Sequence, residues 1–352
     1  MKLIHGGDVA GYEAEYGAKP LDFSANINPL GLPQGVRQAV IGALDSADAY
    51  PDPLCRKLRQ AIARQEGLPM EQILCGNGAA DLIFRLVLAL RPKKALVTAP
   101  TFAEYEQALA LVGCQVQRHM LLEKDDFQLM DRFLQQLHPG LDLVFLCNPN
   151  NPTGQVIRPA LLDEIGERCG KMGIRLVVDE CFQSFLDQPD RHTMKGKLEK
   201  NPMLFLLRAF TKFYAMAGIR LGYGLCADTQ LLEQMAQCGQ PWGVSSLAQA
   251  AGIAALQEKE YAQKTRVLIA KERGWLRQAL AEQKQRVVGG KANYLFFQTD
   301  TPELGQKMRR CGVMIRCCGN YPGLDDSWYR VAVRSHPENL RLIEALKQAR
   351  SM

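Results

Sequence analysis

Short apolar runs alternate with helical patterns through the middle of the sequence, and this alternation limits the possible folds most strongly. Residues 104–112 and 159–172 read as helices, the second with a proline in its first turn. The best strand candidates are bounded by Pro, Gly or Asn: 95–98, 143–147, 176–178, 203–207 and 221–225. Strands that are apolar throughout are typical of a mostly parallel sheet with both faces covered by helices. The pattern therefore predicts an α/β core.

The two ends of the chain differ from this core. The N-terminal 33 residues are rich in loop formers, whereas residues 246–285 have hardly a helix breaker and are expected to bridge the core to the C-terminal part. That part has three strand-like runs and a closing helix: 294–297, 313–317, 328–333 and 337–350. It predicts a second, smaller α+β domain.

The length of 352 residues agrees with two domains, since a domain takes about 150 residues. We predict an N-terminal arm that also contributes to the small domain over residues 1–45. A large domain is expected over residues 46–255 and a C-terminal small domain over residues 256–352.

Charge and hydropathy exclude several classes of protein. The net charge of +6 is spread along the chain without a run of five basic residues, which argues against a nucleic-acid-binding arm or a membrane-binding patch. No stretch reaches the roughly 18 apolar residues that a membrane span needs, and residues 1–8 lack the apolar region of an export signal. We expect small anionic ligands, and neither nucleic acid nor membrane as a partner.

The eleven cysteines are scattered, odd in number and never spaced as C-x-x-C. This pattern argues against zinc ribbons, thioredoxin-like sites and a disulfide framework. Several lie in apolar runs, where a reduced cysteine packs as a small apolar side chain. We therefore expect a cytoplasmic protein without a metal site.

A glycine-rich stretch precedes the apolar run 82–90 and contains Gly78, Ala79 and Ala80. Small residues let backbone amides approach an anion, and a helix N-terminus adds unpaired N–H groups and the positive end of the helix dipole. The stretch is a candidate phosphate seat, although an ordinary glycine-rich loop before a helix would look the same.

Polar residues follow two predicted strands. Run 143–147 is followed by Asn-Pro-Asn-Asn-Pro-Thr-Gly, which contains Asn151, and run 176–178 is followed by Asp179. Open α/β sheets bind ligands at this carboxyl edge. A carboxylate there is well placed to hold a protonated ring nitrogen, whereas Asp179 taken alone reads as a helix cap.

Lys212 follows the predicted strand 203–207 among aromatic and small residues. Desolvation and nearby cations would lower its pKa and make it nucleophilic, although a surface lysine is the plainer alternative. Arg220, eight residues later, offers a planar fork that suits a phosphate.

These motifs, in this order, resemble those of the fold-type I pyridoxal-phosphate enzymes, the aspartate aminotransferase superfamily. The resemblance covers Asn-Pro-x-Asn-Pro-Thr-Gly, Val-Asp-Glu, Thr-Lys and Ala-Gly-Ile-Arg-Leu-Gly. It implies a large domain with a mostly parallel seven-stranded sheet between helices, plus a smaller α+β domain from the chain ends.

Further motifs narrow the resemblance to the threonine-phosphate decarboxylase family of cobamide (vitamin B12) biosynthesis, from end to end. They are His5-Gly6-Gly7, the segments 22–31 and 207–214, Tyr50-Pro51-Asp52, Asn-Tyr-Pro-Gly-Leu-Asp at 320–325 and Tyr-Arg-Val-Ala-Val-Arg-Ser at 329–335. The general motifs do not separate this family from the histidinol-phosphate aminotransferases; the terminal motifs carry the distinction.

The resemblance implies pyridoxal 5'-phosphate as cofactor. Lys212 would form the Schiff base and act as acid and base, Asp179 would pair with the pyridinium nitrogen, and Asn151 would bind the phenolic oxygen. Phe102 would stack on the ring, and Tyr50 would reach the cofactor phosphate of a second subunit in a homodimer. The phosphate would otherwise lie on Gly78, Ala79, Ala80, Thr211 and Arg220.

Two positions depart from the pattern of many relatives. Ala209 stands where a serine usually binds the cofactor phosphate, and Phe182 stands where a tyrosine usually faces the phenolic oxygen. The loss of one hydrogen bond to a charged group costs about 1.5–3 kcal/mol. The seat would be weaker but still present.

The resemblance also implies a substrate site. Arg334 would bind the α-carboxylate, and His5 and Arg316 would grip a substrate phosphate, with Asn28 and Asn151 nearby. Taken alone, His5 reads as a residue of an N-terminal turn and Arg316 as an ordinary strand arginine. The expected reaction is decarboxylation of O-phospho-L-threonine, or of O-phospho-L-serine. The alternatives are histidinol-phosphate transamination and a ligand-binding protein without turnover.

Overall fold

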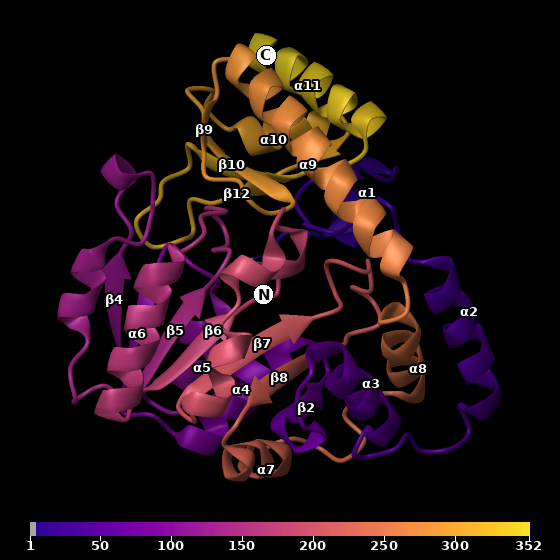
Figure 1. Cartoon of the computed structure of the whole chain (residues 1–352). Helices are drawn as coiled ribbons and strands as arrows, with labels where there is room; N and C mark the ends of the chain where they lie inside the picture. The colour runs from indigo at the N-terminus through magenta and orange to yellow at the C-terminus, as the bar shows by residue number, and fades with distance from the viewer. Residues whose placement is uncertain (1–4) are drawn as a thin grey trace.

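A seven-stranded sheet forms the centre of the larger domain in the computed structural model, which describes residues 5–352 (Figure 1). The strand order is β2-β8-β7-β6-β5-β3-β4, and every neighbouring pair is parallel except the two that involve β8. The strands are β2 (Ile73–Gly76), β3 (Lys94–Ala99), β4 (Gln115–Met120), β5 (Leu143–Cys147), β6 (Arg175–Asp179), β7 (Leu204–Ala209) and β8 (Gly222–Cys226). The predicted α/β fold and its mostly parallel sheet are confirmed.

Helices cover both faces of this sheet, and strand β5 shows why its sequence is apolar throughout. Leu143 and Phe145 pack in the cluster that contains α4 and α5, whereas Val144 and Leu146 pack in the cluster that contains α6. Successive side chains of a strand point to opposite faces, so both faces here are core. The helices around this sheet are α3 (Arg56–Glu66), α4 (Ala79–Leu90), α5 (Glu104–Leu111), α6 (Pro159–Met172), α7 (Thr229–Gln237) and α8 (Ser246–Ala255), and α2 (Gln34–Ala43) packs on α8.

The small domain holds a four-stranded antiparallel sheet in the order β12-β13-β10-β9. In Figure 1 the helices α9–α11 lie above this sheet and the large domain lies below it. The strands are β9 (Arg286–Val288), β10 (Tyr294–Gln298), β12 (Arg316–Cys317) and β13 (Trp328–Ala332). The helices are α1 (Val9–Tyr16), α9 (Lys259–Glu282), α10 (Leu304–Arg310) and α11 (His336–Ser351), and a short parallel pair joins β1 (Leu21–Asp22) to β11 (Val313–Met314).

Three expectations from the sequence were wrong in detail. The helix over 246–285 is broken after Ala255 into α8 and α9, and Glu258 at the break accepts a hydrogen bond from the backbone N–H of Gly35 at 3.1 Å. The strand over 313–317 is split, since β11 pairs with β1 and β12 pairs with β13. The N-terminal arm contains α1, whose first turn is capped by Asp8. Tertiary partners decide where the elements end in the first two cases, whereas α1 begins at a local cap.

The domain boundaries after residues 45 and 255 stay a prediction. All eleven cysteines are free thiols. Within residues 5–352, no helix is both long and apolar enough to cross a lipid bilayer, and no group of His, Cys, Asp or Glu has the arrangement of a metal site.

Candidate active site

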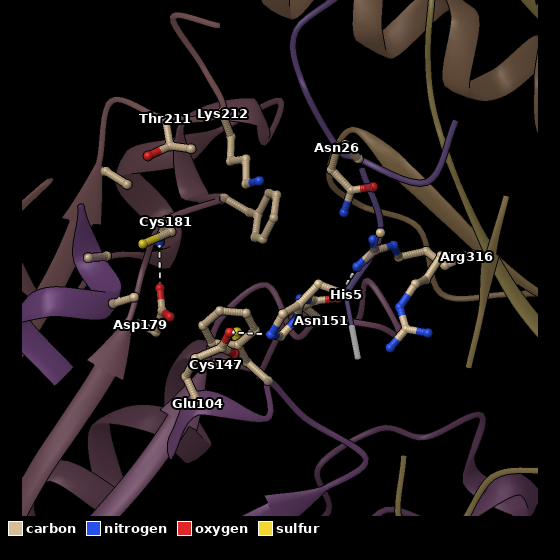
Figure 2. Close-up of a pocket in the computed structure, with 18 of the residues that line it drawn as sticks. His5, Asn26, Glu104, Cys147, Asn151, Asp179, Cys181, Thr211, Lys212 and Arg316 are labelled. Atoms are coloured by element: carbon tan, nitrogen blue, oxygen red, sulfur yellow. Dashed lines mark hydrogen bonds and ion pairs between the residues drawn. The ribbon is translucent and has the colours of Figure 1, made fainter. Parts of the chain in front are cut away.

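A cavity of about 300 Å³ lies at the carboxyl ends of β5, β6 and β7, where the N-terminal segment and the small domain meet the large domain. Most of the residues singled out in the sequence line it. They are His5, Ala79, Ala80, Phe102, Asn151, Asp179, Thr211, Lys212, Arg220 and Arg316. In Figure 2, Lys212 and Asp179 lie on one side of the cavity and Asn26 and Arg316 on the other. Residues from both ends of the chain, such as His5 and Arg316, thus share one site.

Lys212 lies three residues after the end of β7, half-buried in the wall of the cavity. Burial, followed by the positive charges of Arg330 and Arg220, lowers the pKa of its ammonium group to about 8. A lysine with such a pKa is partly a neutral amine near neutral pH, which is the nucleophilic form.

Asp179 is the last residue of β6 and is buried. Its Oδ1 accepts a hydrogen bond from the backbone N–H of Cys181 at 2.9 Å, and its Oδ2 accepts one from the hydroxyl of Tyr105 at 2.7 Å. Burial raises the pKa of the carboxyl group, and these two bonds oppose that rise. Tyr105 was missed by the sequence analysis, because nothing in the helical pattern of 104–112 links it to a residue 74 positions away.

In the candidate phosphate seat, the backbone at Gly78 and Gly222 lies very close to neighbouring groups. Gly78 has a φ of +84°, and a Cβ there would lie 2.7 Å from Nη2 of Arg220. A Cβ on Gly222 would lie 2.5 Å from the backbone nitrogen of Ala79. Glycine is therefore required at both positions if Arg220 is to lie against the first turn of α4. The result is a guanidinium beside unpaired helix N–H groups, an arrangement suited to a phosphate.

Asn151 contacts an arginine that the sequence analysis missed. The guanidinium Nη1 of Arg330 donates to Oδ1 of Asn151, and its Nη2 donates to the backbone oxygen of Ser24 at 2.7 Å. Arg330 is buried on β13, lines the cavity and lies 5.6 Å from the ring centre of Tyr294. The sequence did contain a signal that could have identified Arg330. An arginine within an apolar strand is expected to be buried, and a buried charge needs a partner or a ligand.

The assignment of the carboxylate fork to Arg334 needs correction. The guanidinium of Arg334 is held by Oε1 of Glu338, at 2.5 Å and 2.9 Å, and by the backbone oxygen of Asp22. Glu338 also completes the capping box at the start of α11. The guanidinium of Arg334 is thus bound by Glu338 of the helix that follows it. Arg334 does not line the cavity, whereas Arg330 does.

Two further predicted residues are not part of the cavity of this chain. Asn28 is buried behind it, donating to the backbone oxygen of Phe213 and to the hydroxyl of Thr265, both at 2.7 Å. The role that the structure gives Asn28 is to support the segment that carries Lys212. Tyr50 is 80% exposed and stacks on Trp242.

The remaining predicted residues surround the open part of the cavity. Nη2 of Arg316 donates to Oδ1 of Asn320 at 2.8 Å, and its guanidinium lies 5.2 Å from the ring centre of Tyr321. Nε2 of His5 lies 2.8 Å from Oε1 of Glu104. Ala209 and Phe182, the two departures from the family pattern, also line the cavity.

This set of residues fits pyridoxal phosphate. A partly buried lysine of lowered pKa can bind the aldehyde, the buried carboxylate can face the ring nitrogen, and the Gly78 turn with Arg220 can receive the phosphate. No other cluster of the described residues combines these three features.

Comparison with known proteins agrees with the fold. The family model described as aminotransferase class I and II matches residues 18–346. A threonine-phosphate decarboxylase from Salmonella typhimurium is 41% identical over 97% of this chain and 95% of its own length. A histidinol-phosphate aminotransferase from Desulfitobacterium hafniense is 33% identical over 95% of this chain and 93% of its own length.

A solved structure is similar over nearly its whole length. The histidinol-phosphate aminotransferase from Clostridium acetobutylicum superposes with a TM-score of 0.88 at 29% identity, covering 94% of this chain and 99% of that one. With the family model matching most of the sequence, the conclusion is plain: this chain belongs to the class I and II aminotransferase family.

Proposed function

We propose that the chain is a pyridoxal-phosphate-dependent decarboxylase of O-phospho-L-threonine. The product would be (R)-1-amino-2-propanol O-2-phosphate, a building block of the nucleotide loop of a cobamide. O-phospho-L-serine, which would give ethanolamine phosphate, is a second candidate substrate, because one methyl group is worth only about 1–3 kcal/mol in a pocket. The 41% identity to the Salmonella typhimurium threonine-phosphate decarboxylase supports this proposal.

The observation that carries the proposal is the excess of positive charge in the cavity. Arg220 belongs to the phosphate seat of the cofactor, but Arg330 and Arg316 line the cavity as well. A substrate with both a carboxylate and a phosphate would use both guanidinium groups. Arg330 would bind the carboxylate, and Arg316 with His5 would bind the phosphate.

The cofactor, when bound, withdraws electrons from Cα of the substrate through its protonated ring. Asp179 keeps the ring nitrogen protonated, because an ionised carboxylate beside it stabilises the cation. Asn151 uses its side-chain oxygen to accept from Arg330, so its Nδ2 is left to donate to the phenolic oxygen.

Lys212 and Arg330 then act on the substrate itself. Arg330 orients the carboxylate, and with it the bond from Cα that is to break. Cleavage of that bond would release CO2 and leave an electron pair at Cα, which the bound cofactor would stabilise. Lys212 delivers a proton to Cα in place of the lost carboxylate. The same lysine would remove the Cα hydrogen in a transamination, so orientation of the substrate decides between the two reactions.

Histidinol-phosphate aminotransferase remains the second candidate, supported by the relatives at 33% identity and a TM-score of 0.88. The two functions are separated by the products. We expect O-phospho-L-threonine to give an amino-alcohol phosphate, identified by phosphorus NMR, with no keto acid added. Turnover of histidinol phosphate that depends on 2-oxoglutarate, without that product, would favour the aminotransferase.

We also propose a cytoplasmic homodimer with shared sites. Tyr50 and Trp242 form an exposed stacked pair, 80% and 44% accessible, with ring centres 4.4 Å apart. Exposed aromatic side chains with polar tips are typical of interfaces. Tyr50 would reach the cofactor phosphate of a second copy, and the eleven free thiols are in keeping with a reducing compartment.

A further inference from the structure

Glu104 is a carboxylate that neither the cofactor site nor the substrate site accounts for. It is the first residue of α5, lines the cavity, and has a side chain that is only 13% exposed. Oε1 lies 2.8 Å from Nε2 of His5, whereas Oε2 is buried without a hydrogen-bond partner among residues 5–352.

An isolated negative charge here would oppose the binding of a substrate that carries a phosphate and a carboxylate. Glu104 is close enough to the centre of the cavity to raise the pKa values of both Lys212 and Asp179. Its contact with His5 is the only ion pair that it forms within the described chain, and both residues line the cavity. Pairing with a histidine offsets the unfavourable charge only when the imidazole is protonated and held in place.

His5 is held from two sides. The backbone N–H of Gly7 donates to Oγ of Ser24 at 2.7 Å, and a Cβ on Gly6 would lie 2.5 Å from the backbone oxygen of Ser24. The segment therefore packs closely on residue 24, and the carboxylate of Glu104 contacts the imidazole. A protonated imidazole has two N–H donors, so Nδ1 is left to donate elsewhere when Nε2 faces Glu104.

We propose that Glu104 is a positioning residue that directs the second N–H of His5 at the phosphate of the substrate. The carboxylate, the imidazole and the phosphate would form a chain of charge-assisted hydrogen bonds, with Arg316 on the same phosphate. This inference rests on the proposed function, which supplies the phosphate. It makes Glu104 a determinant of selectivity for phosphorylated over unphosphorylated amino acids.

The test is a double-mutant cycle with Glu104→Gln, His5→Gln and both changes together, each in the cofactor-loaded protein. KM and kcat are measured for O-phospho-L-threonine. Dissociation constants for O-phospho-L-threonine and L-threonine are obtained from the change in visible absorbance of the cofactor. Glu106→Gln is the matched control, because Glu106 lies on the same helix turn but pairs with Arg118. Melting temperature and the absorbance of the unliganded protein report on folding.

Glu104→Gln is expected to raise KM and the dissociation constant for O-phospho-L-threonine about tenfold, the size of one lost bond between charged groups. kcat and the affinity for L-threonine should change less than twofold. The double variant should be no weaker than His5→Gln alone, since Glu104 acts through His5. Glu106→Gln should leave every value unchanged.

An unchanged or lowered KM in Glu104→Gln, or losses that add in the double variant, would overturn the inference. The binding titration needs no turnover. If the wild-type protein releases no CO2 but binds O-phospho-L-threonine more tightly than L-threonine, only the proposed function is refuted. The dissociation constants of the variants would then still test the role of Glu104. Equal affinity of the wild type for the two ligands would overturn the inference itself.

Discussion

Nη1 of Arg330 donates to Oδ1 of Asn151, so strand β13 of the small domain is bonded inside the cavity to the loop that follows strand β5 of the large domain. The same guanidinium reaches the backbone of Ser24 in the N-terminal arm. Three distant segments are thus tied to one positive charge. That charge is the strongest candidate for the carboxylate site.

Replacing Arg330 with Gln should lower kcat/KM for O-phospho-L-threonine by about a hundredfold or more, because a charge-assisted fork to the carboxylate is lost. Arg334→Gln is the matched control. It breaks the contact with Glu338 and should cost about 1 kcal/mol of stability with less than fivefold change in kcat/KM. Steady-state kinetics measure the effect of each variant on catalysis, and melting curves measure its effect on stability. A larger loss of kcat/KM in Arg334→Gln than in Arg330→Gln would favour Arg334 as the carboxylate-binding residue, as the sequence predicted.

Tyr105→Phe should move the acid limb of the pH profile to higher pH. Burial raises the pKa of Asp179 and the hydroxyl of Tyr105 lowers it, so removal of the hydroxyl raises that pKa further. Catalysis needs Asp179 in its ionised form, so kcat/KM falls as the pH drops through the pKa of Asp179 in the folded protein. With a higher pKa, this fall should begin at a higher pH in Tyr105→Phe than in the wild type. The profile of kcat/KM against pH tests this, with Tyr12→Phe as a remote control whose hydroxyl bonds to Arg309. Coincident profiles for wild type and Tyr105→Phe would contradict the role given to Tyr105.

Lys212 in the cofactor-free protein should react with an acylating reagent half-maximally near pH 8, its lowered pKa. An ordinary lysine has a pKa of about 10.4, so surface lysines in the same sample should need a pH roughly two units higher. Labelling at a series of pH values followed by mass spectrometry gives both curves at once. A Lys212 curve that coincides with the surface lysines would remove the argument for an activated amine.

A shared site predicts complementation between two weak variants. Lys212→Ala lacks the attachment lysine, and Tyr50→Ala lacks the group that would reach across to a second copy. Mixed dimers of the two contain one site with both residues intact and should recover up to half of the wild-type activity per mixed dimer. Mixing after dissociation and reassociation tests this, whereas a monomer by sedimentation, or a mixture no more active than its parts, would contradict the proposal.

The interior of the large sheet could be predicted from the sequence, and its edges could not. Strands β3 and β5–β8 are buried on both faces and so have continuous apolar sequences. β4 lies at one edge of the sheet and reads Gln-Val-Gln-Arg-His-Met, with most side chains exposed. Such a strand depends on its pairing with β3, which no local pattern shows.

The site could be predicted where residues follow one another in motifs, and not where it depends on contacts between domains. Lys212, Asp179, Asn151 and Arg220 all lie at the cavity. The choice between Arg330 and Arg334, four residues apart, depends on Glu338 in the next helix, which occupies Arg334. Tyr105 and Glu104 contact Asp179 and His5, which are distant in the sequence. Their roles follow only from the folded chain.

The release of CO2 from O-phospho-L-threonine by the purified, cofactor-loaded protein, with no keto acid present, decides whether the chain is a decarboxylase. One CO2 is expected for each amino-alcohol phosphate formed, and no release is expected from Lys212→Ala. Failure to release CO2 from either O-phospho-L-threonine or O-phospho-L-serine, together with 2-oxoglutarate-dependent turnover of histidinol phosphate, would contradict the proposed decarboxylase function.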